Sequence, residues 1–115
     1  MFAQAAAVGF SVPPEEAAHE FCLMQWPVNT TVHDDPEFLD ILQGTIADIA
    51  NATADFEPVV LLADKSHHAA ARKLLSSAVT LWDIPTDDLW ARDSGPIITT
   101  NGKGARQVSH IRFNG

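Results

Sequence analysis

The chain has 115 residues, which is the size of one ordinary domain and too short for two. Its 15 acidic residues outnumber 7 lysines and arginines and give a formal charge of -8, a balance that repels phosphate backbones and anionic membrane surfaces. Nucleic acid and membranes are therefore not expected as partners. Hydrophobic residues make up 46% of the chain, which predicts a folded core rather than disorder.

The cysteine count and the N-terminal residues bear on the compartment. Cys22 is the single cysteine, which excludes an intrachain disulfide and a thiolate metal cluster built from this chain alone. No apolar run reaches the roughly 18 residues that span a bilayer. Residues 1–7 lack a basic region, although Ala3-Gln4-Ala5 has the small-x-small pattern of a signal-peptide cleavage site. We expect a cytoplasmic protein, with secretion as the alternative if residues 1–7 are the remnant of a signal peptide.

The first half of the chain predicts a strand, a helix and a second strand. Residues 21–26 are a short apolar run that a proline ends, which is typical of a buried strand. Asp35, Pro36 and Glu37 provide a capping side chain, a proline at the first helical position and an acid at the positive end of the helix dipole. Residues 58–63 are continuously apolar, which predicts a strand covered on both faces. Helical spacing continues to about residue 52, and the predicted apolar face consists of Phe38, Leu42, Thr45, Ile46 and Ile49.

The second half predicts a helix, a strand and a hairpin. Ser66 can cap a helix that contains residues 69–75, and residues 78–82 form a third strand. Residues 96–100 and 106–113 read as two strands joined by a turn at residues 101–104, where two glycines give a strong hairpin signal. This order of elements predicts an α/β protein with a mixed sheet.

Residues 84–96 are the unusual segment, because they place three aspartates, an arginine and a tryptophan in the loop after the third predicted strand. Loops at strand ends commonly hold ligands in α/β proteins. A guanidinium presents N–H donors in a flat fork, and a carboxylate accepts two of them side by side. Asp88 and Asp93 can supply such carboxylates, and the ring face of Trp90 can attract a cation. Arg92 would then need a carboxylate partner of its own, since it would otherwise repel a cationic substrate.

The same segment also fits a structural interpretation. Asp87 and Asp88 can be turn and capping residues, Arg92 can be salt-bridged to an acid, and Trp90 can fill the core. Composition alone does not decide between the two interpretations.

The other candidate catalytic or metal-binding residues do not indicate a site. Cys22 lies in an apolar predicted strand, where burial raises the pKa of a thiol, so we interpret it as an inert core residue rather than a nucleophile. His67 and His68 are adjacent on a predicted helix and cannot readily grip one metal ion together. His33 and His110 stand alone and indicate polar surface or satisfied core residues. No metal site is expected.

Two segments together resemble the agmatine deiminase and bacterial peptidylarginine deiminase family of the pentein superfamily. Residues 12–20, followed by Met24-Gln25-Trp26-Pro27, are similar to the opening of that family. Residues 87–96, Asp-Asp-Leu-Trp-Ala-Arg-Asp-Ser-Gly-Pro, are similar to its Asn/Asp-Asp-x-Trp-x-Arg-Asp-Thr/Ser-Gly-Pro signature, and this second motif is the specific one. Phe113-Asn114-Gly115 also looks like the start of a Phe-Asn-x-Trp-Gly stretch.

The resemblance implies a fold and a reaction. The fold would be a pentein, an α/β propeller of five ββαβ-type modules, of which residues 1–115 would supply the N-terminal part, roughly one module plus part of another. The reaction would hydrolyse a small-molecule or peptidyl guanidinium to a ureido group and ammonia through a cysteine-linked amidino intermediate, and it would need no cofactor. Asp93 would be the catalytic aspartate that binds the guanidinium, with Asp88, Trp90 and Arg92 lining or supporting the substrate site.

The resemblance also has departures and open points. Leu23 stands where the family often has an aromatic residue, and Asp87 stands where it more often has asparagine. Family members are about three times this length, so we expect the catalytic histidine, a second guanidinium aspartate and the nucleophilic cysteine outside this chain. The alternative is a noncatalytic module, either a truncated product or a partner half that a C-terminal part or another copy completes.

Overall fold

The computed structural model describes residues 9–110 and 112 and shows an α/β protein, as the sequence predicts. The described residues fall into two compact units. One unit is His19–Ala91, and the other consists of the described residues before and after it. Parallel and antiparallel pairing are both present, but they lie in two separate sheets, one in each unit.

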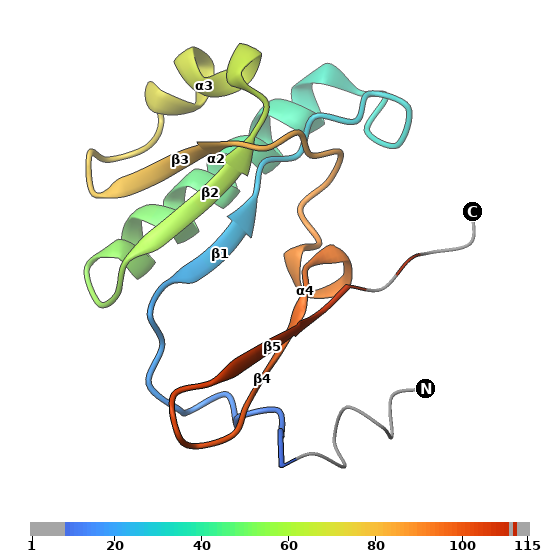
Figure 1. The fold of residues 1–115 in the computed structure, drawn as a ribbon. Helices are drawn as coiled ribbons and strands as arrows, with labels where there is room; N and C mark the ends of the chain where they lie inside the picture. Colours follow the sequence, from blue (N-terminus) through green and yellow to red (C-terminus); the bar gives the residue numbers. More distant parts are fainter. Residues whose placement is uncertain (1–8, 111, 113–115) are drawn as a thin grey trace. The chain divides into compact units, whose positions relative to one another are not determined.

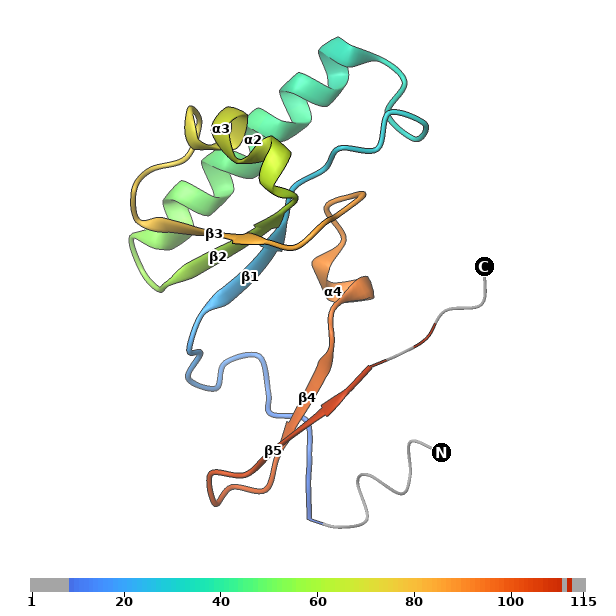
Figure 2. The same cartoon turned by 45° about the horizontal axis from the view of Figure 1, so that its top comes forward.

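The unit His19–Ala91 is built on a three-stranded parallel sheet (Figure 1). Strands β1 (Cys22–Gln25), β2 (Val59–Ala63) and β3 (Val79–Asp83) lie in the order β1-β2-β3. Helix α2 (Pro36–Ala54) connects the first pair and helix α3 (Lys65–Arg72) the second. Each connection advances one strand in the same direction, so right-handed crossovers place both helices on the same face of the sheet, as Figures 1 and 2 show.

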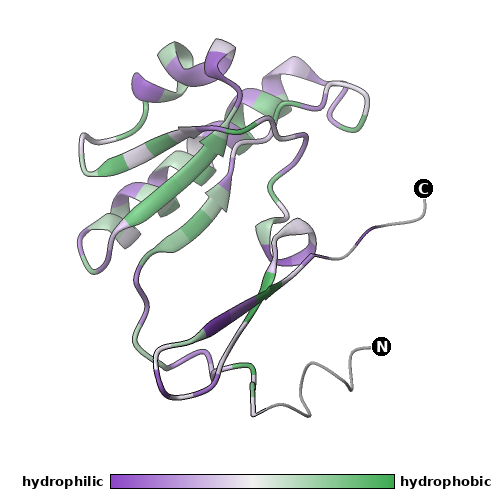
Figure 3. Ribbon diagram, viewed as in Figure 1, coloured by the Kyte–Doolittle hydropathy of each residue, from purple (hydrophilic) through white to green (hydrophobic). Residues whose placement is uncertain are grey.

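Strand β2 is the centre of the core, and all five of its residues are buried. The continuous apolar run is visible along the whole strand in Figure 3. Val59, Leu61 and Ala63 alternate onto the helix-covered face and are at most 1% exposed. The prediction of a buried central strand is therefore confirmed. The rest of this core comes from both helices and the neighbouring segments: Trp26, Ile46, Ala47, Ala50, Ala71, Leu75 and Val79.

Helix α2 begins where the sequence predicts, but it buries a different face. The Asp35 side chain caps the helix by accepting a hydrogen bond from the Glu37 N–H at 3.0 Å. The buried residues are Ile46, Ala47 and Ala50, and of the five residues predicted for the apolar face, Phe38, Thr45 and Ile49 are exposed instead. That part of the prediction is wrong, because small alanines let the helix lie close to the sheet along a stripe that a pattern of large apolar residues does not mark.

Helix α3 is capped two residues earlier than predicted, by Asp64 instead of Ser66. The Asp64 carboxylate accepts the Ser66 N–H at 2.9 Å and the Ser66 hydroxyl at 2.6 Å, so Ser66 lies inside the helix. The helix ends at Arg72 rather than at residue 75. Arg72 then donates to the carbonyls of Ser76 and Val79, which satisfies backbone acceptors in the turn into β3.

The second unit contains the predicted hairpin. Strands β4 (Ile97–Thr100) and β5 (Arg106–Ser109) pair antiparallel, with Thr100 opposite Arg106. Gly102 and Gly104 have φ values of 72° and 91°, which glycine adopts without strain. The prediction of a hairpin is confirmed, although β5 stops at Ser109; the predicted residues 111 and 113 and the motif at residues 113–115 lie outside the described residues.

Candidate functional site

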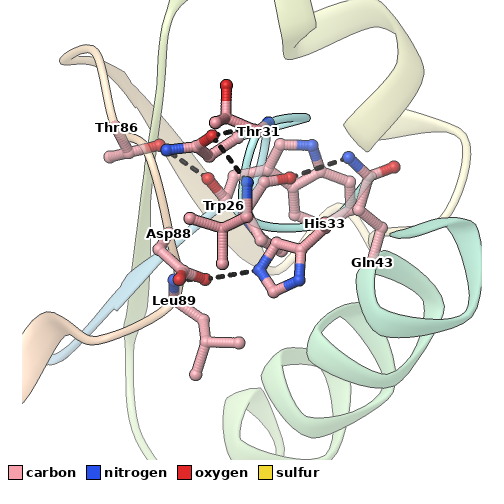
Figure 4. Close-up of polar contacts among 10 residues, drawn as sticks. Trp26, Thr31, His33, Gln43, Thr86, Asp88 and Leu89 are labelled. Carbon is pink, nitrogen blue, oxygen red and sulfur yellow. Dashed lines mark hydrogen bonds and ion pairs between the residues drawn. The ribbon is translucent and has the colours of Figure 1, made fainter. Parts of the chain in front are cut away.

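The segment that follows β3 is hydrogen-bonded to the loop that follows β1. The Asp87 carbonyl accepts the N–H groups of Val28 and Asn29 at 2.8 and 2.9 Å. The Thr86 hydroxyl donates to the Trp26 carbonyl at 2.7 Å (Figure 4). Both loops leave the carboxyl ends of parallel strands, which is the edge of the sheet where ligand residues were expected. The backbone of the candidate segment is therefore held in place.

The Asp88 carboxylate has protein partners. Its Oδ1 atom lies 3.1 Å from His33 Nε2 (Figure 4), and it also accepts the Leu89 N–H at 2.8 Å. One oxygen of the carboxylate is thus used by a side chain and by a backbone N–H of the two loops.

The surroundings of Asp88 change its acidity. Desolvation acts to raise the pKa, but the hydrogen bonds from His33, Leu89 and Trp90 and the charge of His33 act in the opposite direction, and the pKa of the carboxyl is lowered overall. The ionised form of Asp88 is therefore the form that the loop stabilises.

Trp90 lies at the surface, and its side chain is one of the groups that lower the pKa of Asp88. The residue is 59% exposed, so the interpretation of Trp90 as a core residue is wrong, and Trp26 is the buried tryptophan. The face of an exposed indole ring can attract a cation.

Arg92 has the carboxylate partner that the sequence analysis required. Its guanidinium lies 2.7 Å from Glu15, and both side chains are largely exposed. A solvated ion pair of this kind contributes little to stability. Its consequence is electrostatic, because the Glu15 charge offsets a cation beside the candidate aspartate.

Asp93 differs from Asp88 because its carboxylate has no hydrogen-bond partner among the described residues. It lies on the single helical turn α4 (Ala91–Ser94) and is exposed. Within residues 9–110 and 112, its carboxylate takes part in no hydrogen bond and no ion pair. Asp88 and Trp90 belong to the unit His19–Ala91, whereas Arg92 and Asp93 belong to the other unit.

The other candidate residues considered from the sequence are Cys22 and the histidines. Cys22 lies in β1 and packs against the core, although its side chain is half-buried rather than fully buried. Desolvation, followed by the negative charge of Glu57, raises the pKa of the Cys22 thiol, which disfavours the thiolate. His68 bonds the Ala63 carbonyl at 2.8 Å. In the described part of the chain, no three histidine, cysteine or acidic residues are grouped to hold a metal ion.

Comparison with known proteins identifies the family. Residues 11–115 match the Porphyromonas-type peptidyl-arginine deiminases. The chain belongs to this family. The resemblance inferred from the two motifs is thus confirmed.

The relatives of this family member carry agmatine deiminase names. A Streptomyces coelicolor protein named "Putative agmatine deiminase" is 38% identical over 106 residues, which cover 92% of this chain and 31% of the relative. A Streptomyces avermitilis protein of the same name is 37% identical over 110 residues, which cover 96% of this chain and 32% of the relative. The chain therefore spans about a third of the length of the curated relatives that it matches.

Solved structures show the fold of the family. The agmatine deiminase of Enterococcus faecalis superposes with a TM-score of 0.73 at 22% identity, covering 89% of this chain and 27% of that structure. The Campylobacter jejuni enzyme, described as "C. Jejuni Agmatine Deiminase", gives a TM-score of 0.71 at 24% identity, covering 91% of this chain and 32% of that structure. The chain has part of a pentein fold. Among its described residues, no helix is long and apolar enough to cross a membrane.

His33 is the residue at this edge of the sheet that the sequence analysis overlooked. It lies 55 positions from Asp88 in the chain, and nothing in its immediate neighbours marks it as more than a lone histidine. The available signal was topological: His33 follows β1 and Asp88 follows β3, and the carboxyl ends of parallel strands meet at one edge.

Proposed function

We propose that this chain is the guanidinium-binding part of a guanidine deiminase that hydrolyses agmatine or peptidyl arginine to a ureido product and ammonia. One observation carries the proposal. The family match runs through the segment 87–96, in which Asp93 is exposed and has a carboxylate without a partner in the described chain. We propose that residues 1–115 are the N-terminal part of one deiminase domain.

Asp93 is proposed to bind the guanidinium through two parallel hydrogen bonds. A carboxylate matches two N–H groups of a guanidinium fork in geometry and in charge. Such binding keeps the substrate cationic, so that its central carbon stays electrophilic, and it orients that carbon for attack. Asp93 would therefore act as an orienting and electrostatic group rather than as a nucleophile.

The remaining steps need groups from beyond residues 1–115. A cysteine thiolate would attack the guanidinium carbon, ammonia would leave with a proton, and water activated by a histidine would release the ureido product and regenerate the thiol. Cys22 is a poor candidate for this thiolate because it packs against the core and its pKa is raised. No cofactor takes part in this sequence of steps.

Trp90 and Arg92 are proposed to shape the surroundings of the substrate. The exposed ring of Trp90 offers a face to a cation or to the carbon chain that bears it. Arg92 is proposed to act through its pairing with Glu15, which leaves the region of Asp93 free of an uncompensated positive charge. Asp88 is proposed to support the substrate site from the loop that holds it, where its carboxylate is hydrogen-bonded to His33.

The substrate class and the location stay predictions. The family name refers to peptidyl arginine, whereas the names of the relatives refer to agmatine. Both substrates share the guanidinium that Asp93 would bind, and they differ at the far end of the molecule. A cytoplasmic location is likewise a prediction from the sequence.

The test is a chimera in which residues 11–115 replace the matched segment of the Streptomyces coelicolor relative. We expect ammonia release from agmatine or from a blocked arginine peptide, and the preferred substrate names the class. Asp93→Asn should lower kcat/KM at least about a hundredfold, because two charge-assisted hydrogen bonds worth roughly 1.5–3 kcal/mol each are lost.

Asp87→Asn is the matched control, since Asp87 uses its backbone carbonyl to hold the loop and asparagine is common at that position in the resembling signature. Its kcat/KM should stay within a few-fold of the parent chimera, and thermal melts establish that each variant is folded. Near-normal turnover in Asp93→Asn together with a crippled Asp87→Asn would show that the guanidinium receptor is assigned to the wrong residue.

The second candidate function is a noncatalytic module or a partner half. It is favoured by the raised pKa of Cys22, the only thiol of this chain. A complementing C-terminal part or a homo-oligomer would then have to supply the nucleophile, and both partners stay predictions.

A further inference from the structure

Helix α2 carries apolar residues on two sides. Its inward side packs against the sheet, where Ala47 and Ala50 are buried. Its outward side carries Phe38, Ile41 and Ile49, which are 51%, 60% and 49% exposed. As Figures 1 and 2 show, α2 lies on one face of the sheet, so its other side points away from the sheet. A helix that packs on one partner normally has polar residues on its far side, so large apolar residues there indicate a second contact.

The exposed apolar residues form a continuous stripe along α2. Together with Thr45 they recur three and four positions apart, a spacing that places side chains on one side of a helix. Thr45 adds no unmatched polar group, because its hydroxyl donates to the Ile41 carbonyl at 2.9 Å. The Phe38 ring lies 6.1 Å from the His33 ring, measured between centroids, so one end of the stripe is packed by a neighbouring side chain. We call Phe38, Ile41, Thr45 and Ile49 the outward stripe.

The outward stripe has the dimensions of a helix-packing surface. Residues 38–49 of a helix rise about 16 Å, which is three turns. A second helix that lies along such a stripe places its own apolar residues, spaced three and four positions apart, between those of the first. An amphipathic helix therefore fits the shape of the stripe.

The charges beside the outward stripe are all negative. Helix α2 contains Glu37, Asp40 and Asp48 and no lysine, arginine or histidine, and the three acidic side chains are exposed. Glu37 lies four positions before Ile41 and Asp48 seven positions after it, so both are its neighbours on the helix surface. A complementary partner carries lysine or arginine beside its apolar face. A second copy of α2 would bring only acidic side chains to the contact, and an anionic membrane surface would be repelled.

We propose that the outward stripe of α2 is a docking surface for an amphipathic helix of a partner protein that carries lysine or arginine beside its apolar face. The apolar contact supplies the affinity in this scheme, and the acidic side chains select a basic helix over an acidic one. The proposal concerns only the unit His19–Ala91 and does not depend on the deiminase reaction.

The test uses a synthetic amphipathic helix with leucines on one face and lysines beside them, titrated into the isotope-labelled chain. NMR shifts should be largest at the outward stripe. A matched peptide with glutamate in place of each lysine should bind at least about tenfold more weakly, because it meets the acidic side chains with like charge. Asp48→Asn should weaken binding of the lysine peptide about twofold to fivefold, as expected for one exposed charge pair. Asp87→Asn, which removes an exposed acid outside α2, should leave this affinity unchanged.

The double variant Ile41→Ser with Ile49→Ser tests the apolar part of the surface. Binding of the lysine peptide should weaken at least about tenfold, because two central anchors are truncated. Serine and isoleucine have similar helix propensities, so the melting temperature should change little. Val108→Ser is the matched control, since Val108 is a β-branched residue that is 63% exposed on β5. It should bind the peptide as the unmodified chain does.

Several results would overturn the proposal. Shifts centred outside α2, equal binding of the two peptides, or unchanged affinity in the double serine variant would each do so. Dimers of the unmodified chain that Ile41→Ser dissociates in sedimentation would make a second copy the occupant. Binding to phosphatidylserine vesicles that Ile41→Ser abolishes would make it a membrane surface. If the chimera with the Streptomyces coelicolor relative does not bind the lysine peptide, the rest of the enzyme covers the stripe. Should the double variant not fold, the shift map, the peptide pair and Asp48→Asn still decide the outcome.

Discussion

Asp88 and Asp93 are five positions apart, yet their carboxylates are in different chemical situations. The Asp88 carboxylate is hydrogen-bonded to His33 and to the Leu89 N–H. Asp93 is exposed and has no partner among residues 9–110 and 112. A carboxylate that is bonded to protein donors can support structure, whereas one without such partners can receive a ligand. Burial and partnership, rather than residue type, therefore separate the two roles.

Replacement of Asp88 by asparagine tests the structural role through its pH dependence. The pKa of Asp88 is lowered in the folded chain, so the ionised group stabilises the fold above its unfolded pKa of about 3.9, and this contribution is lost as the pH falls through the lower folded value. At neutral pH we expect Asp88→Asn to destabilise the chain by about 1 kcal/mol, the usual net worth of a hydrogen bond. Urea unfolding at several pH values measures this difference, which should shrink below about pH 4.

A difference between Asp88→Asn and the unmodified chain that stays constant down to pH 2–3, or that grows in acid, would contradict the assignment. Asp87→Asn is the control here also. Its side chain has no hydrogen bond among the described residues, and its carbonyl contacts are retained.

The sequence predicted the candidate aspartate segment but not its individual contacts. Electrostatics required a partner for Arg92. Glu15, which is far away in the sequence, provides it. The contact between His33 and Asp88 was not predicted, because it becomes visible only when β1 and β3 are placed in one parallel sheet. A local sequence pattern shows which chemical groups are present. Which distant residues pair with them is known only from the fold.

At the scale of elements, the sequence predicts helix starts and turns correctly where only one nearby residue can form the cap or the turn. The Asp35-Pro36-Glu37 start of α2 and the glycine turn of the hairpin are both confirmed. Two cap-forming residues lie near the start of α3, and the side chain of Asp64 caps it rather than that of Ser66. The buried face of α2 was misjudged because alanines carry the contact with the sheet. Where several residues could form the same cap or the same buried face, tertiary packing determines which of them does.

The cap of α2 provides a stability prediction at this scale. Asp35→Ala removes the acceptor for the Glu37 N–H and should lower the free energy of unfolding by about 0.5–2 kcal/mol. Asp35→Asn should recover most of this loss, because asparagine is an equally good cap. Urea unfolding monitored by circular dichroism gives the values.

Asp34→Ala is the matched control, since Asp34 is the exposed neighbour of Asp35 and makes no described contact. It removes the same charge from nearly the same place. Equal destabilisation by Asp34→Ala and Asp35→Ala would mean that the loss arises from charge near the helix dipole and not from the cap.

At the scale of the whole molecule, the chain contains the segment that is proposed to bind the guanidinium, whereas its one thiol is a poor candidate for the attacking group. It spans about a third of its curated relatives, and its single thiol packs against the core in β1. The raised pKa of that thiol leaves little thiolate at neutral pH. Binding and chemistry are therefore expected to be separable in this chain.

The isolated 115-residue chain should accordingly release no ammonia from agmatine or from a blocked arginine peptide. Adding the remaining two thirds of the Streptomyces coelicolor relative as a separate polypeptide should restore turnover if the two parts associate, because the proposed nucleophile and histidine would then be present. Cys22→Ser should leave that restored activity unchanged, since serine conserves the size of a residue with no part in the chemistry. Ammonia release by the isolated chain that disappears in Cys22→Ser would make Cys22 the nucleophile. The half-buried position of its side chain would then have to open far enough in solution to admit a guanidinium, and the raised pKa would have to fall when the cationic substrate binds beside it.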